Sequence, residues 1–306
     1  WVLRKFMNIS GSEGLVAAGN IFMGMTESPV LIKNYLPTMN RSEIFLVMVS
    51  GMGTIAGSVM GTYIGMLGGT DPAAKVLFAT HLLSASVMAV PGSIVLAKML
   101  CPQTEEATDH VAISGKEKEN SNILDAISSG TVTGVKLMTN IAAMLLVFIS
   151  LVALANYITE GVIGRYTGLN DWIVKITDGK AQGLTFQFIL GVITSPFMWL
   201  IGVPSQDIML VGSLLGQKTI LNEFVAYFQL QQWKDAGLFM YEKSILMSTY
   251  ILCGFANISS IGILLGGLGV LAPEKRGLIS RIGVPAMIGG ALVSVLSATI
   301  IGMILG

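Results

Sequence analysis

Six long stretches of the chain carry no charged side chain. Each runs for 22 to 30 consecutive positions without Asp, Glu, Lys or Arg. The stretches are 44–70, 76–97, 137–159, 181–206, 244–273 and 282–306. A helix needs about 20 apolar residues to cross the hydrocarbon core of a bilayer. The pattern therefore predicts an all-α polytopic membrane protein, because the buried helices of a soluble core would rarely supply six such runs.

Near the start of the chain, a shorter apolar segment is interrupted by polar residues that end in a glutamate. Ser12 is expected to cap a helix that runs to about Gly24, shortly before Glu27. About 12 residues at 1.5 Å each reach only ~18 Å, which is too short to span a membrane. Ser28 and Pro29 then begin an apolar return, since Pro suits a first helical turn.

A second segment, in the rear of the chain, follows the same plan. Ser205 is expected to cap a helix that ends near Leu221. About 16 residues give ~24 Å, again less than a full crossing. Asn222 and Glu223 form the polar tip, and an apolar return begins at Phe224. We interpret both segments as re-entrant hairpins, as in transporters built from two inverted repeats.

The apolar stretch after each hairpin contains small and polar residues at membrane depth. They occur in GMGTIAGSVMGTYIGM (51–66) and in GFANISSIGIL (254–264). Close packing of helices explains most of the glycines. The Asn and Ser side chains of the second run instead fit a helix that is interrupted inside the membrane, where freed carbonyl groups line a polar cavity.

Composition supports a membrane protein and gives no sign of an enzyme. Hydrophobic residues make up 53% of the chain and charged residues 12%, against roughly 25% charged in soluble domains. Lys+Arg and Asp+Glu balance at 18 each, which offers nothing to a nucleic acid. There is no zinc-protease or phosphate-loop motif and no nucleophile with a base. Glu27 and Glu223 are costly in a membrane, so they are candidate functional groups.

A polar stretch at 103–126 divides the chain, and we expect two repeat cores around a scaffold. The first core is 1–102, with a re-entrant hairpin at about 12–36, an interrupted helix at about 43–68 and a transmembrane helix at about 75–101. Residues 127–203 form the scaffold and connecting helices. The second core is 204–306, with a hairpin at about 205–236, an interrupted helix at about 243–271 and a transmembrane helix at about 277–305.

Four motifs in this order resemble the concentrative nucleoside transporters, which are cation-coupled nucleoside symporters. They are GNIFMGMTESP, GTIAGSVMGTYIGM, GVPSQDIMLVGSLLGQKTILNEFVAY and GFANISSIGIL, and the resemblance covers essentially the whole chain. It implies two inverted repeats, a homotrimer, a multi-pass place in the bacterial inner membrane, and uptake of nucleosides. The family also has helices ahead of the first hairpin, so a chain that opens on Trp1 is expected to lack an N-terminal portion.

The resemblance also assigns roles to residues. The side chains of Asn20 and Ser58 and the carbonyl groups of Met23 and Val59 match the sodium site, with sodium as the coupling ion and no other cofactor. The first hairpin tip matches the edge that recognises the base, and the second repeat matches the ribose site. The substrate-binding residues are therefore expected to be Met25, Thr26, Glu27, Glu223, Phe255, Asn257 and Ser260.

Met25 departs from the commonest pattern of the family, in which Gln follows the glycine. Losing Gln removes two donors and an acceptor, and family members with Gly-Met favour purine nucleosides. Proton coupling stays open as an alternative. So does an inverted-repeat carrier for another polar solute, although a dicarboxylate carrier would need cations at the tips, and Lys33, Arg41 and Lys218 are not at a tip.

Overall fold

The computed structural model is entirely helical in the part of the chain that it describes. The described residues are 9–105, 153–177 and 181–306, with Met7, Gly179 and scattered positions between 122 and 151. Most of the expected linker and most of the 137–159 stretch lie outside them. The chain divides into two units, Trp1–Val111 with Leu190–Gly306, and Ala112–Ile189.

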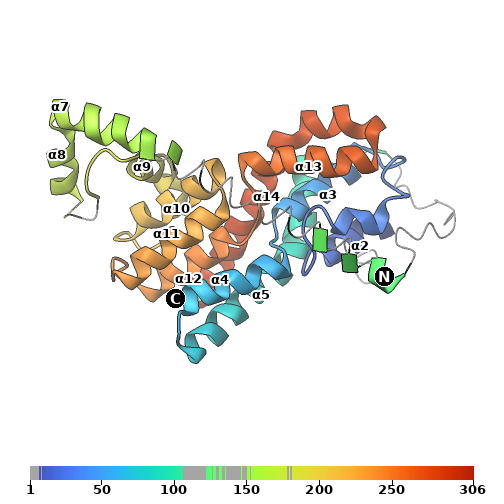
Figure 1. The fold of residues 1–306 in the computed structure, drawn as a ribbon, viewed down its shortest axis with the longest axis horizontal. Helices are drawn as coiled ribbons and strands as arrows, with labels where there is room; N and C mark the ends of the chain where they lie inside the picture. Colours follow the sequence, from blue (N-terminus) through green and yellow to red (C-terminus); the bar gives the residue numbers. More distant parts are fainter. Residues whose placement is uncertain are drawn as a thin grey trace. The chain divides into compact units, whose positions relative to one another are not determined.

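The first hairpin begins with helix α2, Gly11–Gly19 (Figure 1). Its cap is Ser10, whose hydroxyl accepts a hydrogen bond from the Glu13 N–H while the Glu13 carboxylate accepts one from the Ser10 N–H. The prediction of Ser12 as the cap was wrong, because the Ser-x-x-Glu capping box starts at Ser10. The helix also ends five residues before Gly24, at the Gly19-Asn20 turn.

The return of the first hairpin is a short 3-10 helix, Ser28–Ile32, followed by turns as far as Thr38. Pro29 lies in its first turn, where its missing N–H has no cost. Ser28 is buried, and its hydroxyl donates to the Val16 carbonyl of α2 at 3.1 Å. This bond ties the two arms of the hairpin together.

Two half-helices and one long helix follow. Helix α3, Arg41–Met52, is capped by Asn40, and helix α4 is Gly57–Gly68. The residues between them, 53–56, are not helical. Asp71 caps helix α5, Pro72–Leu100, by accepting hydrogen bonds from two N–H groups of its first turn.

The second hairpin follows α9, Phe186–Leu200, and consists of α10, Ile208–Ile220, and α11, Glu223–Asp235. Asn222 caps α11 by accepting from the Val225 N–H at 2.9 Å. The expectation that Ser205 caps the first arm was wrong. Asp207 precedes α10, and its carboxylate accepts from the Met240 and Tyr241 N–H groups instead of capping its own helix.

The chain ends in a second broken helix and a second long helix. Helices α12, Glu242–Leu252, and α13, Ile258–Leu271, are separated by the non-helical residues 253–257. A short 3-10 turn, Pro273–Lys275, leads into α14, Arg276–Ile304.

In the Ala112–Ile189 unit, a π-helix at Tyr157–Gly164 continues into α7, Arg165–Thr167, and α8, Leu169–Ile176. Asn170 holds this unit together: its amide donates to the Glu160 carbonyl and accepts from the Leu184 N–H, both at 3.0 Å. Gly168, with φ +72°, allows the turn between α7 and α8.

The first unit has two hydrophobic cores. One half of each broken helix packs in the first core, and the other half packs in the second core. One core joins α2 and α3 to α13, and the other joins α4 to α10, α11 and α12. Both α5 and α14 run through the two cores. In Figure 1, α2 and α3 accordingly lie near α13, whereas α4 lies near α11 and α12. The two halves of the sequence are therefore interlocked at the helix breaks.

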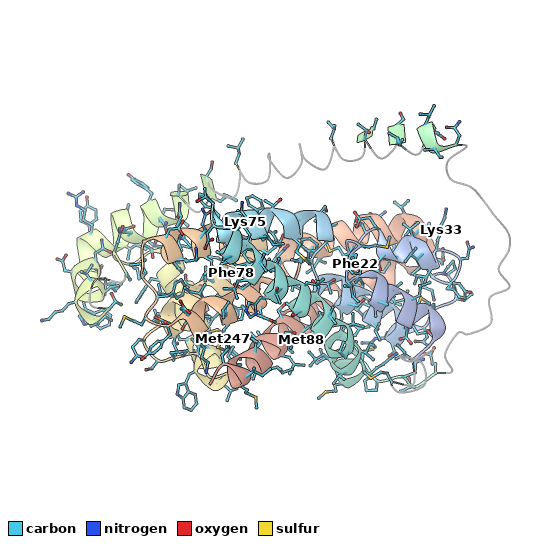
Figure 2. All side chains as sticks on the ribbon, turned by 90° about the horizontal axis from the view of Figure 1, so that it is seen from below. Phe22, Lys33, Lys75, Phe78, Met88 and Met247 are labelled. Carbon is cyan, nitrogen blue, oxygen red and sulfur yellow. The ribbon has the colours of Figure 1, made fainter. Side chains whose placement is uncertain are left out.

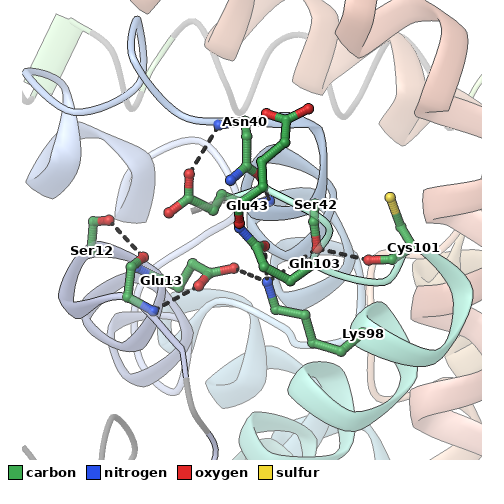
Figure 3. Close-up of polar contacts among 10 residues, drawn as sticks. Ser12, Glu13, Asn40, Ser42, Glu43, Lys98, Cys101 and Gln103 are labelled. Carbon is green, nitrogen blue, oxygen red and sulfur yellow. Dashed lines mark hydrogen bonds and ion pairs between the residues drawn. The ribbon is translucent and has the colours of Figure 1, made fainter. Parts of the chain in front are cut away.

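A buried polar cluster fixes the start of the first hairpin to α5 (Figure 3). The Lys98 ammonium forms an ion pair with Glu13 and donates to Ser42 Oγ at 3.1 Å and Gln103 Oε1 at 2.9 Å. Ser42 Oγ in turn donates to the Cys101 carbonyl at 2.7 Å. Because Glu13 is almost fully buried, removing the Lys98 charge would leave the Glu13 carboxylate without compensation.

In the part of the chain that the structure describes, three helical segments are long and apolar enough to cross a membrane: Arg41–Gly68, Pro72–Leu100 and Pro273–Ile304. Three shorter apolar helices, Phe186–Leu200, Ile208–Ile220 and Ile258–Leu271, fall below that length. Figure 2 draws the side chains, with Phe22 labelled on the first hairpin and Phe78 and Met88 along α5. Large apolar side chains are exposed along Pro72–Leu100, Phe186–Leu200 and Pro273–Ile304, which suits lipid as the surrounding solvent, whereas those of Arg41–Gly68 are buried or half-buried.

Candidate functional site

The two helix breaks touch each other beside α14. The Phe255 N–H donates to the Thr54 carbonyl at 3.2 Å, so the second break is bonded to the first. A Cβ on Gly254 would come within 2.9 Å of the Met52 carbonyl oxygen and 2.7 Å of Ser294 Oγ. Only glycine permits this approach. The backbone groups that leave the helices therefore meet at one place inside the protein.

Three residues expected in the second repeat form one hydrogen-bonded cluster at the second break. Asn257 Nδ2 donates to Glu223 Oε2 at 2.9 Å, while Asn257 Oδ1 accepts from the N–H and the hydroxyl of Ser260 at 2.9 and 3.0 Å. All three residues are buried. Asn257 is the N-cap of α13 and Glu223 lies in the first turn of α11, so the carboxylate faces two positive helix ends.

A tyrosine that sequence reasoning did not single out completes this cluster. Tyr63 of α4 donates its hydroxyl to Glu223 Oε1 across 3.4 Å, and its ring stacks on Tyr227 at a centroid distance of 4.1 Å. The Tyr227 hydroxyl donates to the Thr249 carbonyl at 2.8 Å. Tyr63 and Tyr227 lie far apart in the sequence. The signal available was a tyrosine in a glycine-rich membrane segment, where its hydroxyl needs a partner.

Phe255 lies between the two cores. Its side chain is half-buried and packs against both of them. The residue thus reaches the region between the half-helices, next to Asn257. An aromatic ring at such a junction offers an apolar face beside the polar Glu223 cluster.

The tip of the first hairpin packs on α3 and α13. Met25 is buried, and its Cβ would lie 2.8 Å from a Cβ on Gly51. Thr26 is half-buried with its methyl group toward Gly267 of α13. Glu27 is exposed, and its carboxylate folds back over Gly24. Within the described residues, no hydrogen bond joins the Thr26 or Glu27 side chain to the Glu223 cluster.

Asn20 carries a buried oxygen without a partner. The residue is fully buried, its Nδ2 donates to Ser50 Oγ at 2.9 Å, and its Oδ1 has no hydrogen-bond partner among the described residues. An unsatisfied buried acceptor costs about 1–3 kcal/mol. An amide oxygen in this state is a suitable ligand for a hard cation, which prefers oxygen.

The other expected cation ligands surround the first break less closely. The Gly57 N–H donates to the Phe22 carbonyl at 2.9 Å, so the hairpin turn that holds Met23 rests on the start of α4. Ser58 follows directly but its side chain is exposed, and Val59 is half-buried. The structure therefore brings the Asn20 turn and the start of α4 together, without a hydrogen bond between Asn20 and Ser58.

The donor set at Asn20 suits a monovalent cation. Among the described residues, no group of three or more His, Cys, Asp or Glu side chains is placed to hold a metal ion. The oxygens near the break are neutral amide, hydroxyl and carbonyl groups, from α2 and α3. Sites for sodium at interrupted membrane helices are built from such groups.

Comparison with known proteins identifies relatives of the whole chain. The family described as Na+ dependent nucleoside transporter C-terminus matches residues 81–302, and a family described as nucleoside recognition matches residues 1–70. An uncharacterized transporter of Haemophilus influenzae is 39% identical over 99% of this chain and 68% of its own length. Sodium/nucleoside cotransporter 1 of Rattus norvegicus is 38% identical over 99% of this chain and 46% of its own length.

Solved structures give the same relationship. An inward-facing, substrate-bound structure of CNTnw matches with a TM-score of 0.83 and 35% identity, over 100% of this chain and 67% of that one. A CNTnw double variant in an outward-facing state matches with a TM-score of 0.85 and 36% identity, over 99% and 68%. The helical fold is therefore that of a transporter.

Proposed function

This chain belongs to the Na+-dependent nucleoside transporter family, and on that premise we propose that it takes nucleosides into the cell by symport with sodium. The observation that carries this proposal is the buried Glu223 cluster at the junction of two helix breaks. A nucleoside presents hydroxyl donors on its ribose, and a carboxylate accepts such bonds strongly. The family consists of transporters, and no step of chemical conversion is involved.

The ribose would bind at Glu223, Asn257 and Ser260. Glu223 is the only charged member of this trio, and its two oxygens accept from Asn257 and Tyr63 with lone pairs to spare. A ribose hydroxyl would compete with the long 3.4 Å contact from Tyr63 more easily than with the 2.9 Å contact from Asn257. Phe255 would cover the apolar face of the nucleoside.

The base would face the first hairpin tip at Met25, Thr26 and Glu27. Met25 brings an apolar, flexible side chain to this tip, which suits the larger face of a purine. A preference for purine nucleosides follows from this choice of side chain. The exposed position of Glu27 leaves its carboxylate available to a nucleoside amino group.

Sodium would bind at Asn20 with the carbonyl groups of Met23 and Val59 and the hydroxyl of Ser58. Support comes from the unpartnered Asn20 Oδ1 and from the hydrogen bond between Phe22 and Gly57, which seats the hairpin on the first break. An ion there would fix the turn that leads into Met25. Sodium would thereby raise nucleoside affinity, and the nucleoside would raise sodium affinity by the same factor.

Two further features belong to this proposal. We place the protein in the bacterial inner membrane as a homotrimer, in which both hairpins with their interrupted helices move against the remaining helices. Proton coupling is the second candidate for the driving ion.

The membrane potential would add to the driving force. At 100 mV, each sodium ion that enters would contribute about 2.3 kcal/mol, enough for accumulation of the nucleoside against its gradient.

Uptake by proteoliposomes tests the proposal. The purified protein is given labelled adenosine, inosine, cytidine or uridine with sodium or choline outside, at fixed pH. We expect sodium-dependent uptake, stronger for the purines, with unmodified nucleoside recovered inside. Equal uptake in choline would contradict sodium coupling, and competition by succinate would indicate a dicarboxylate carrier.

A further inference from the structure

Lys218 is a fully buried cation in the last turn of α10 that the proposed transport site does not use. Its Nζ donates to the Ile251 carbonyl at 2.8 Å and to Ser294 Oγ at 3.0 Å. No carboxylate in the described part of the chain forms an ion pair with it. A buried ammonium without an ion pair is costly even though Glu223 is close enough to interact with it through space, so its retention calls for a reason.

Lys218 replaces the donor that the helix break removes. In a continuous helix the Ile251 carbonyl would accept from the Phe255 N–H, but that N–H donates to Thr54 instead. Ser294 Oγ donates to the Cys253 carbonyl at 3.0 Å, so it offers Lys218 an acceptor. The ammonium thus lies among neutral oxygens at the negative end of half-helix α12.

At the first break, too, a side chain at the end of a hairpin helix reaches the last turn of a half-helix, but this side chain carries no charge. Asn20, at the end of α2, reaches Ser50 in the last turn of α3, just as Lys218, at the end of α10, reaches Ile251 in the last turn of α12. The oxygen of this side chain, Asn20 Oδ1, is an acceptor to which no described group donates a hydrogen bond. Among the described residues, no lysine or arginine bonds to Asn20 or Ser50.

We propose that Lys218 is a tethered cation that does at the second break what sodium does at the first, so that one sodium accompanies each nucleoside. The inference rests on the proposed function, since it assigns sodium to the first break. Lys218 is a positioning residue: it fixes the end of α12, and the break that follows presents Asn257 to Glu223. The second repeat would then need no ion of its own.

Replacing Lys218 tests this role through the sodium dependence of transport. The variants are Lys218→Ala, which leaves space for a small cation, and Lys218→Met, which fills the space without charge. Lys234→Ala is the matched control, because Lys234 Nζ also donates to a half-helix carbonyl, that of Leu67 at 2.9 Å, but from a partly exposed position. Size-exclusion chromatography checks folding.

In the wild type and in Lys234→Ala we expect sodium activation with a Hill coefficient of about 1. Lys218→Ala should lose transport on the order of tenfold, within the usual range of coupling between sites. Methylammonium, but not the larger tetramethylammonium, should restore uptake by Lys218→Ala. Alternatively, a second sodium should occupy the space, so that the Hill coefficient for sodium rises toward 2. Lys218→Met should be impaired and not rescued.

Three results would overturn the inference. The first is transport at the wild-type rate by Lys218→Met. The second is a folded Lys218→Ala protein whose uptake no cation restores and whose sodium activation keeps the wild-type Hill coefficient. The third is a measured stoichiometry of two sodium ions per nucleoside in the wild type. The last measurement needs no variant, so it decides the matter if the variants do not fold. Uptake by the wild type that does not depend on sodium would instead contradict the proposed function. In that case the role of Lys218 would still be tested by measuring whether methylammonium restores nucleoside binding to Lys218→Ala.

Discussion

Asn257 Nδ2 lies 2.9 Å from Glu223 Oε2, and this contact joins the starts of α13 and α11. The same asparagine caps α13 through its oxygen. One side chain therefore both begins a half-helix inside the protein and holds the buried carboxylate of the second hairpin. A displacement of Asn257 would therefore alter its hydrogen bond to Glu223.

Glu223→Gln should weaken nucleoside uptake strongly. The substitution keeps the shape of the side chain but replaces a charged acceptor, and hydrogen bonds to charged groups contribute about 1.5–3 kcal/mol. We expect KM for adenosine to rise roughly 10- to 150-fold. Kinetics of labelled adenosine uptake measure the change. Glu242→Gln, in the exposed first turn of α12, is the control and should transport normally.

Asn257→Asp separates the two roles of Asn257. Aspartate caps a helix as well as asparagine does, so α13 should remain intact. The substitution removes the donor to Glu223 and places two carboxylates side by side. We expect uptake to fall, and repulsion between the two carboxylates to lower the thermal midpoint in detergent less at low pH, where one carboxylate binds a proton, than at neutral pH. Asn257→Ala should instead lower that midpoint about equally at both pH values by removing about 1 kcal/mol of capping. Normal uptake by Asn257→Asp would show that the contact with Glu223 is dispensable.

Asn20→Ala should raise the sodium concentration needed for half-maximal uptake. The buried Oδ1 is the acceptor assigned to the ion, and losing one such ligand should shift the requirement roughly tenfold. Uptake at saturating sodium should recover. Asn40→Ala, which removes the cap of α3, should lower stability without this shift. An unchanged sodium requirement in Asn20→Ala would place the ion elsewhere.

Met25→Gln should broaden use toward pyrimidine nucleosides. The substitution returns two donors and an acceptor to the hairpin tip in a side chain of similar length. We expect the ratio of adenosine to uridine uptake to fall, as measured by competition between the two labelled nucleosides. Because Met25 packs against Gly51, some loss of stability should accompany the change. An unaltered ratio in folded protein would contradict the role assigned to Met25.

The sequence predicted the class of fold through its charge-free stretches, because the cost of charge in hydrocarbon leaves a strong mark on composition. The family resemblance placed Glu223, Asn257 and Ser260 at the ribose, and that role stays a prediction; in the structure the three residues are hydrogen-bonded to one another. Local capping was less well predicted. The capping box of α2 begins at Ser10, three residues before Glu13, and not at the predicted Ser12.

The partners of the site could not be predicted in the same way. Tyr63 reaches Glu223 across 160 positions, and Lys218 reaches Ser294 across 76. Such contacts depend on how the half-helices cross, which periodicity and propensity do not encode. The sequence indicates only that Lys218 is not at a hairpin tip, and its place beside the second break is given by its hydrogen bonds to Ile251 and Ser294.

The measurement that tests sodium-driven nucleoside uptake most directly is the final accumulation of adenosine in proteoliposomes. A tenfold inward sodium gradient is imposed, with the membrane potential clamped to zero and the pH equal on both sides. A tenfold gradient stores about 1.4 kcal/mol per ion, so one sodium per nucleoside should concentrate adenosine about tenfold inside. Adenosine that levels off at the outside concentration, with sodium or with choline, would contradict the account.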